Sequence, residues 1–293
     1  MATWPLIPEW MKDITEELPK HSKDDPRFKR AAKRAKERGQ SFVMPKKDRT
    51  WMKRKVAQIR GVCFHQSWGG DDPFATNNYH TGPNHITSKG CPAICYTLYV
   101  DGAGRVYLCN PLHDIPWSQG TSEMPGSESR MFLSVCVGGK FRNSTHKQLP
   151  APTGPQMEAC ARIWDWAQGA FDMTGVDIFG HFDFGKSTCP GTDLERWILM
   201  QRTESGLLVL ADTKDWQQAL VDLKYDLGRA GPEKNGVDGD WGPKSRAALV
   251  QFQRDWEIPL TGVFDRMTAW MFRNIKERGV ELIEFDDASI VLV

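Results

Sequence analysis

The sequence has no long run of apolar residues and no export signal of the standard kind. No stretch approaches the roughly 18 consecutive apolar residues that a membrane-spanning helix requires, although 40% of the 293 residues are hydrophobic. Residues 1–20 contain no basic segment followed by an apolar core and a small-residue cleavage site. We therefore expect a globular protein of about two domains, made in a cytoplasm without a signal peptide.

The cysteines do not form the framework of a secreted disulfide-rich protein. There are seven, an odd number, scattered along the chain without a repeated spacing. We expect reduced thiols, most of them buried as small apolar groups. Cys91 and Cys95 are a close pair, but no second pair follows at zinc-ribbon spacing, so these two are also predicted to be buried thiols and not a structural zinc site.

The net charge is only +1, but the charges are unevenly distributed. Residues 20–60 hold 16 Lys and Arg against 4 Asp and Glu, so this stretch carries +12 and the remainder of the chain −11. Asp25 and Pro26 are typical of a helix start and Gly39 of a helix end, which predicts a short basic helix between them. The segment is either a solvated appendage or a surface that attracts an anionic partner. Aromatic residues are too sparse among the charges to favour nucleic acid.

Residues 56–200 combine strand-like and helical patterns. The strand-like runs are residues 56–68, 93–110, 130–141 and 177–185, the second of which contains the hairpin turn signal DGAG. Apolar residues at helical spacing, with a proline in the first turn, predict a helix over 154–171. The pattern predicts an α/β fold with a mixed central sheet flanked by helices. His65 and His181 both fall where a predicted strand gives way to a loop, which is where sheets present functional groups.

The stretch GHFDFGKSTCPG, residues 180–191, places His181 and Cys189 eight positions apart around a polar loop. Catalytic zinc usually takes three protein ligands from His, Cys and carboxylate groups and leaves a fourth position for water. His65, His181 and Cys189 would supply such a set. The alternative is a core histidine that lies near an unrelated thiol, and the residue types alone leave both interpretations open.

Four segments in order resemble a known family. CFHQSW, GCPAICYTLYVDGAGRVYL, FLSVCVGG and GHFDFGKSTCPG, within residues 58–200, are similar to the zinc-dependent N-acetylmuramoyl-L-alanine amidases of phage endolysins and peptidoglycan recognition proteins. The resemblance implies that His65, His181 and Cys189 bind Zn²⁺, and that zinc-activated water attacks the amide bond between N-acetylmuramic acid and L-alanine. It also implies that Tyr96 is the catalytic tyrosine, in a motif that reads Cys-Tyr-Thr in place of the family's Gly-Tyr-His.

Some positions depart from the family pattern. Many members carry a lysine or threonine shortly before the third ligand, where it acts on the oxyanion, and Lys186 and Thr188 are both candidates for that role. Cys136 stands where some members place a glutamate as general base. Trp117 and Ser118 stand where the family usually has a His-Ala pair, which alters how the glycan or the stem peptide is held.

Two further histidines are candidates for substrate binding. His80 and His85 lie in NNYHTGPNHITSKG, whose Asn, Gly, Pro and Ser residues are typical of a surface rim. We predict that these histidines, together with Trp117, line the substrate groove and do not bind the catalytic metal.

The last part of the chain has a helical pattern. Residues 215–280 contain DGDWGP, ALVQFQ and TGVFD in that order, and their apolar spacing fits three short helices. These motifs resemble the three-helix peptidoglycan-binding domain attached to wall hydrolases; a generic helical bundle is the alternative. Trp241, in DGDWGP, is predicted to bind substrate by stacking on a sugar, or else to pack as a hinge between helices.

The predicted organisation has five parts. They are a basic helical segment at 1–55, an amidase domain at 56–200, a linker at 201–214, an all-α peptidoglycan-binding domain at 215–280 and a tail at 281–293. We expect a monomeric, Zn²⁺-dependent endolysin that is made in the host bacterial cytoplasm, acts on the cell wall after release and binds peptidoglycan, with its basic segment at an anionic envelope surface.

Three other functions are less consistent with the sequence. The first is a non-catalytic peptidoglycan-binding protein. Recognition proteins that lack the cysteine ligand bind peptidoglycan without cutting it, so the presence of Cys189 argues against this function. A zinc peptidase of the stem peptide would need a carboxylate ligand at a spacing that the sequence lacks. Nucleic-acid binding has no support from either domain.

Overall fold

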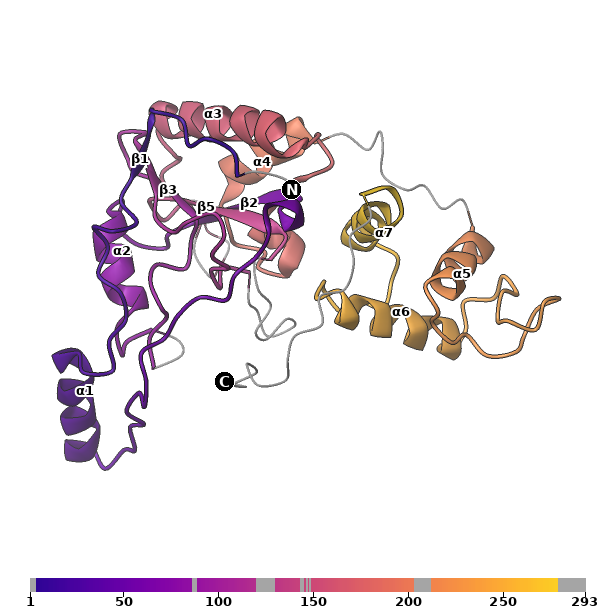
Figure 1. The fold of residues 1–293 in the computed structure, drawn as a ribbon, viewed down its shortest axis with the longest axis horizontal. Coiled ribbons are helices and arrows are strands. Elements are labelled where there is room, and N and C mark those ends of the chain that lie inside the picture. The colour runs from indigo at the N-terminus through magenta and orange to yellow at the C-terminus, as the bar shows by residue number, and fades with distance from the viewer. Residues whose placement is uncertain are drawn as a thin grey trace.

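The computed structural model shows a six-stranded sheet with its helices, followed by a group of three helices (Figure 1). The described residues are 4–85, 89–119, 130–142, 145, 147, 149–202 and 212–278. The predicted linker at 201–214 lies mostly outside these ranges, and the predicted tail at 281–293 lies wholly outside them. Within the described ranges, no helix combines the length and the apolar character needed to cross a membrane.

The sheet is mixed, as the sequence predicted. Its strands are β1 (Met11–Asp13), β2 (Gly61–Gln66), β3 (Leu98–Val100), β4 (Val106–Leu108), β5 (Phe132–Val137) and β6 (Ile178–Gly180). They lie side by side in the order β1-β4-β3-β5-β2-β6. β3 and β4 form the antiparallel hairpin expected from the DGAG turn, and the other described pairs are parallel.

Seven α-helices lie within the described residues. They are α1 (Pro26–Glu37), α2 (Pro73–His80), α3 (Gly154–Phe171), α4 (Thr192–Gln201), α5 (Thr213–Asp222), α6 (Pro243–Asp255) and α7 (Arg266–Arg278). Two short 3₁₀ helices, Val56–Gln58 and His181–Phe184, precede β2 and follow β6. The last three α-helices confirm the predicted all-α C-terminal domain.

The N-terminal segment contributes one strand to the sheet and also contains a basic helix. β1 pairs in parallel with β4, and Ile14 and Leu18 then join a buried hydrophobic cluster that includes Tyr99. The predicted basic helix is confirmed as α1. The Asp25 side chain caps it by accepting the backbone N–H of Arg27 at 2.8 Å.

Two helices cover one face of the sheet. α3 lies along it in Figure 1, and α4 packs beside β6. α3 begins at a capping box, because the Thr153 hydroxyl accepts the Gln156 N–H and the Gln156 side chain accepts the Thr153 N–H. Both helices pack on strand side chains such as Phe64, and burying each such side chain contributes about 1.5–3 kcal/mol.

The C-terminal helices begin at residues that favour helix starts. Pro243 follows Gly242 at the first position of α6, where a missing N–H breaks no helical hydrogen bond. Asp265 precedes α7, and its carboxylate accepts the backbone N–H of Thr268 at 2.9 Å. Both starts lie within residues 215–280, where the sequence predicted three short helices.

α7 attaches the helical domain to the sheet. The Trp270 ring stacks on Phe132 of β5 with centroids 5.2 Å apart and meets Phe179 of β6 edge-on at 5.1 Å. Arg266 donates to the carbonyl of Val176 at 2.7 Å. Phe132, Phe179 and Trp270 belong to one hydrophobic cluster that also includes side chains of α5 and α6, so the two domains share a buried interface.

Candidate functional site

The three predicted metal ligands meet at one edge of the sheet. His65 lies near the carboxyl end of β2, His181 directly follows the neighbouring parallel strand β6, and Cys189 lies in the next loop. The two imidazole centroids are 4.6 Å apart, and one ligand atom from each of the three residues lies within 4.8 Å of the others. All three side chains are buried.

The alternation of side chains along β2 gives His65 its direction. Neighbouring side chains of a strand point to opposite faces of a sheet. Phe64 packs in the core under α3 and α4, so Cys63 and His65 point to the other face. The parallel pairing of β2 with β6 then places the carboxyl ends of both strands, and hence both histidines, at the same edge.

Asp183 holds the turn that carries His181. Its carboxylate accepts the Gly180 N–H at 2.9 Å and pairs with Arg202. Burial raises the pKa of Asp183, and the Arg202 charge opposes that shift. The His181 ring hydrogen-bonds the backbone of Gln119, an arrangement typical of a metal-ligating imidazole.

Gln66 holds the loop that carries Cys189. Its backbone N–H donates to the Cys189 Sγ at 3.3 Å, and its side-chain amide donates to the Thr188 carbonyl at 2.7 Å. The side-chain oxygen accepts the Phe141 N–H at 2.6 Å, so one amide ties together two loops at this edge of the sheet. A role for Gln66 was not predicted from the sequence, where its only signal is its place next to His65 at a strand end.

The three side chains fit a zinc ion. Within the described part of the chain, both ring nitrogens of His65 and the Nε2 of His181 are buried without a hydrogen-bond partner, which is costly for polar atoms. Burial lowers the pKa of His65 well below 6.5 and that of His181 to about 3, so both imidazoles are neutral at pH 7. Burial raises the pKa of Cys189 to about 12, and a bound cation favours the thiolate.

Tyr96 lies next to these ligands. Its ring centroid is 5.3 Å from that of His65, and its hydroxyl hydrogen-bonds Cys136, the residue at the family's glutamate position. Burial raises the pKa of Tyr96 well above 10, with the neighbouring Cys136 and Cys189 adding to the shift. The hydroxyl therefore keeps its proton at pH 7 and is able to donate it in a hydrogen bond.

Lys186 and Thr188 differ in exposure. Lys186 is exposed, and its charge lowers the pKa of both His181 and Cys189, which places the ammonium group near these ligands. Thr188 is buried, and its carbonyl accepts the Gln66 amide. Their roles toward an oxyanion stay predictions.

His80 and His85 lie next to each other and are separate from the three predicted metal ligands. His80 ends α2, is buried and accepts the Cys95 N–H on Nδ1 at 2.9 Å. Its ring centroid is 5.2 Å from that of His85. The Tyr96 ring contacts His80 at 5.6 Å as well as His65 at 5.3 Å, so it lies against both groups. A role for His80 and His85 in substrate binding stays a prediction.

The two tryptophans predicted to bind substrate, Trp117 and Trp241, are both partly exposed. Trp117 packs edge-on against Trp51 with centroids 5.2 Å apart, and the Arg49 guanidinium lies 5.1 Å from its ring. Trp241 packs edge-on against Trp216 within the helical domain, with centroids 5.6 Å apart. Each ring is anchored by another tryptophan, and substrate binding by either stays a prediction.

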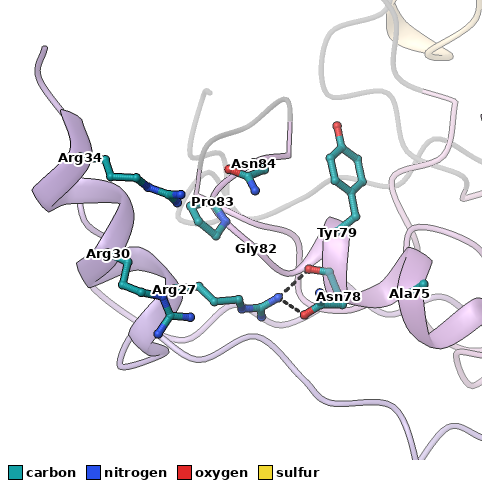
Figure 2. Close-up of a pocket in the computed structure, with 9 residues that line it drawn as sticks. All are labelled: Arg27, Arg30, Arg34, Ala75, Asn78, Tyr79, Gly82, Pro83 and Asn84. Carbon is teal, nitrogen blue, oxygen red and sulfur yellow. Dashed lines mark hydrogen bonds between the residues drawn. The ribbon is translucent and has the colours of Figure 1, made fainter. Parts of the chain in front are cut away.

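A cavity of about 380 Å³ lies between α1 and α2 (Figure 2). Arg27, Arg30 and Arg34 line its α1 side, because positions three and four apart share one face of a helix. Figure 2 shows Arg27 reaching Asn78 of α2, whose backbone oxygen accepts at 2.6 Å. Tyr79 lines the opposite side. An arginine-lined cavity of this kind attracts anionic groups.

Several solved structures are similar to this chain. The N-acetylmuramoyl-L-alanine amidase LysC from Clostridium intestinale URNW is 17% identical, with a TM-score of 0.39, and the match covers 53% of this chain and 95% of that one. Bumblebee PGRP-SA is 14% identical, with a TM-score of 0.41 and coverage of 53% and 90%. The Ph2119 endolysin from Thermus scotoductus MAT2119 bacteriophage Ph2119 is 20% identical, with a TM-score of 0.39 and coverage of 52% and 88%.

Two family models match the sequence, in the order that the motifs predicted. Residues 55–192 match the N-acetylmuramoyl-L-alanine amidase family, and residues 210–269 match a peptidoglycan binding domain. A comparison with curated proteins gave no match. The chain therefore combines a domain of the N-acetylmuramoyl-L-alanine amidase family with a C-terminal peptidoglycan binding domain.

Proposed function

We propose that this protein is a zinc-dependent endolysin that hydrolyses the amide bond between N-acetylmuramic acid and L-alanine. The observation that carries the proposal is the buried set of His65, His181 and Cys189, with unpartnered ring nitrogens, in a domain of the amidase family. A zinc ion held by these side chains supplies a Lewis acid that polarises the amide carbonyl and activates water.

The neighbouring side chains supply the remaining chemistry. The protonated Tyr96 hydroxyl donates to the oxygen on which negative charge develops, or passes a proton to the leaving amine. The Lys186 ammonium group, close enough to shift the pKa of His181, stabilises the same negative charge. Gln66 and the Gln119 backbone hold the ligands in place before substrate arrives.

The C-terminal domain is proposed to hold the enzyme on its insoluble substrate. Binding peptidoglycan through residues 210–269 makes encounter with the scissile bond intramolecular, which raises the effective concentration of substrate at the amidase site. The interface around Trp270 limits how far the two domains reorient. We further propose that the protein acts on the wall only after its release from the cytoplasm.

Digestion of purified peptidoglycan tests the activity. The wild type is expected to release stem peptides that begin with L-alanine, identified by mass spectrometry, and to contain zinc. Cys189→Ala is expected to lose both zinc from this site and hydrolysis. Cys160→Ala, which removes a buried thiol of α3, is the matched control and is expected to keep both.

The rival function is peptidoglycan binding without cutting. It predicts that the wild type sediments with purified wall, releases no peptides and keeps the same wall affinity after Cys189→Ala. That result would reject hydrolysis while leaving the C-terminal domain's binding intact.

The arginine-lined cavity supports a further part of the proposal, that α1 binds an anionic envelope surface. Arg30 and Arg34 are exposed on the cavity face, where they contact phosphate groups. Deleting residues 1–55 is a poor test, because it also removes β1 from the sheet. The double charge reversal Arg30→Glu/Arg34→Glu leaves the strand and the helix cap in place.

This variant is expected to bind anionic phospholipid vesicles less well and to lose activity on intact cells that bear an outer membrane. Activity on purified peptidoglycan should be unchanged. An equal loss on cells and on purified wall would reject a role at the envelope surface.

A further inference from the structure

A second group of metal-ligating side chains lies outside the proposed catalytic set. The Nδ1 of His85 is 3.5 Å from the Cys91 Sγ, and ligand atoms of His85 and Cys95 lie within 4.8 Å of each other. The thiols of Cys91 and Cys95 hydrogen-bond one another. Both cysteines are buried, at 1% and 4% exposure, and His85 is partly buried. His85 therefore lies close to each of the two cysteines, and a ligand atom of His80 also lies within 4.8 Å of those of His85 and Cys95.

We propose that His85, Cys91 and Cys95 bind a second zinc ion, which replaces the sequence-based prediction that these two cysteines are only buried thiols. Zinc accepts imidazole and thiolate donors, and a tetrahedral ion places them about 3.4–3.8 Å apart. The separation of 3.5 Å between His85 and Cys91 already falls in that range. A bound cation favours the thiolate form of each cysteine over the thiol.

His80 supports this site without being one of its ligands. Its Nδ1 accepts the Cys95 N–H at 2.9 Å, so the neutral ring carries its proton on Nε2 and presents no free lone pair to a metal. The carbonyl of the same residue accepts the Cys91 N–H at 2.7 Å. His80, the last residue of α2, thus fixes the backbone of both cysteines.

The charge of the second site suits a structural role. Two thiolates and one imidazole neutralise a zinc ion, whereas one thiolate and two imidazoles leave a net positive charge for activating water. Zinc at the second site would fix Cys95, and therefore the adjacent Tyr96, whose ring contacts both His80 and His65. Only this consequence for Tyr96 rests on the proposed function.

Zinc content after equilibration with zinc and removal of the excess tests the proposal. The Cys189→Ala background removes a ligand of the first set and so isolates the second. We expect this variant to keep one zinc per chain by elemental analysis and native mass spectrometry. Adding Cys91→Ala or Cys95→Ala removes that ion, whereas adding Cys160→Ala does not.

Two further measurements distinguish a direct loss of zinc binding from a loss caused by unfolding. His85→Gln changes a partly exposed loop residue and is expected to weaken zinc binding in the Cys189→Ala background at least tenfold, with an unchanged circular dichroism spectrum. Zinc is also expected to protect Cys91 and Cys95, but not Cys160, from alkylation in the presence of mild denaturant.

The outcomes separate the two sites. A folded Cys189→Ala protein that binds no zinc overturns the second site, as does equal alkylation of Cys91 and Cys95 with and without zinc. A Cys91–Cys95 disulfide in protein purified under reducing conditions also overturns it. If the wild type and Cys189→Ala both hold a single zinc that Cys95→Ala removes, the second site stands and the proposed catalytic site fails.

Discussion

The indole Nε1 of Trp270 donates to the Oδ1 of Asp177 across 2.8 Å, and both side chains are fully buried. Asp177 directly precedes β6, the strand that leads to His181, whereas Trp270 belongs to α7 of the other domain. The second carboxylate oxygen of Asp177 accepts the Thr174 N–H at 2.8 Å, and Arg273 lies 3.4 Å from the first. Contacts from the C-terminal helical domain therefore stabilise the start of β6, the strand that positions the proposed metal ligand His181.

Trp270→Ala is expected to destabilise the amidase domain as well as its own domain. Removing a fully buried tryptophan costs about 3–5 kcal/mol, and the change also leaves Asp177 without one of its donors. In calorimetry we expect the wild type to unfold in a single cooperative transition and Trp270→Ala to unfold in two, with the amidase domain unfolding at a lower temperature than in the wild type. Trp241→Ala, a partly exposed tryptophan that packs on Trp216, is the control and should leave one transition. Coincident transitions in Trp270→Ala would argue against coupling through this residue.

Gln66→Met is expected to weaken zinc binding at the proposed catalytic site about 10–100-fold. Methionine has a similar volume but lacks the amide, so the Thr188 carbonyl and the Phe141 N–H lose their partner and the loop carrying Cys189 is released. Competition with a chromophoric chelator measures the affinity. Unchanged affinity would mean that the backbone N–H of residue 66 suffices to hold Cys189.

Tyr96→Phe is expected to lower kcat on purified peptidoglycan by roughly 10²-fold, the scale of one hydrogen-bond donor or proton-transfer group. Zinc content and wall binding should not change, because the hydroxyl is neither a metal ligand nor part of the C-terminal domain. Steady-state kinetics with elemental analysis tests this. A change in KM alone, with kcat preserved, would show that Tyr96 only binds substrate.

His21 is expected to make the fold sensitive to mild acid. Its Nε2–H donates to the Lys89 carbonyl at 2.9 Å, and its Nδ1 accepts the Arg49 N–H at 3.2 Å. Burial lowers the pKa of His21 below 6.5, so the unfolded chain binds the proton more readily than the folded one. The free energy of unfolding should therefore fall as the pH drops below about 6.5 and level off below the folded-state pKa.

Urea unfolding of the wild type and of His21→Gln between pH 7.5 and pH 4 measures this effect. The slope attributable to His21 is at most about 1.4 kcal/mol per pH unit. His21→Gln should be less stable at pH 7.5 and should show a shallower pH dependence. Parallel curves for the two proteins would contradict the assignment.

Local signals in the sequence were enough to place most elements. Asp25 and Pro26 predicted the start of α1, and the DGAG turn predicted the β3–β4 hairpin. Such signals act over a few neighbouring residues, through caps, fixed φ angles and tight turns. β1 was missed because it has only three residues, and because its pairing with β4 depends on a strand about 95 positions away.

Local motifs were enough to predict the two domains and the residue types at the proposed active site, two histidines at strand ends and a cysteine in the following loop. How these and other side chains meet depends on the tertiary fold. Parallel pairing of β2 and β6 joins His65 to His181, and the loop after α2 brings His85 to Cys91 and Cys95. The hydrogen bonds from Trp270 to Asp177 and from Gln66 to Thr188 also join residues that are distant in sequence. Periodicity and caps encode neighbours along the chain, whereas these contacts depend on the packing of the whole sheet.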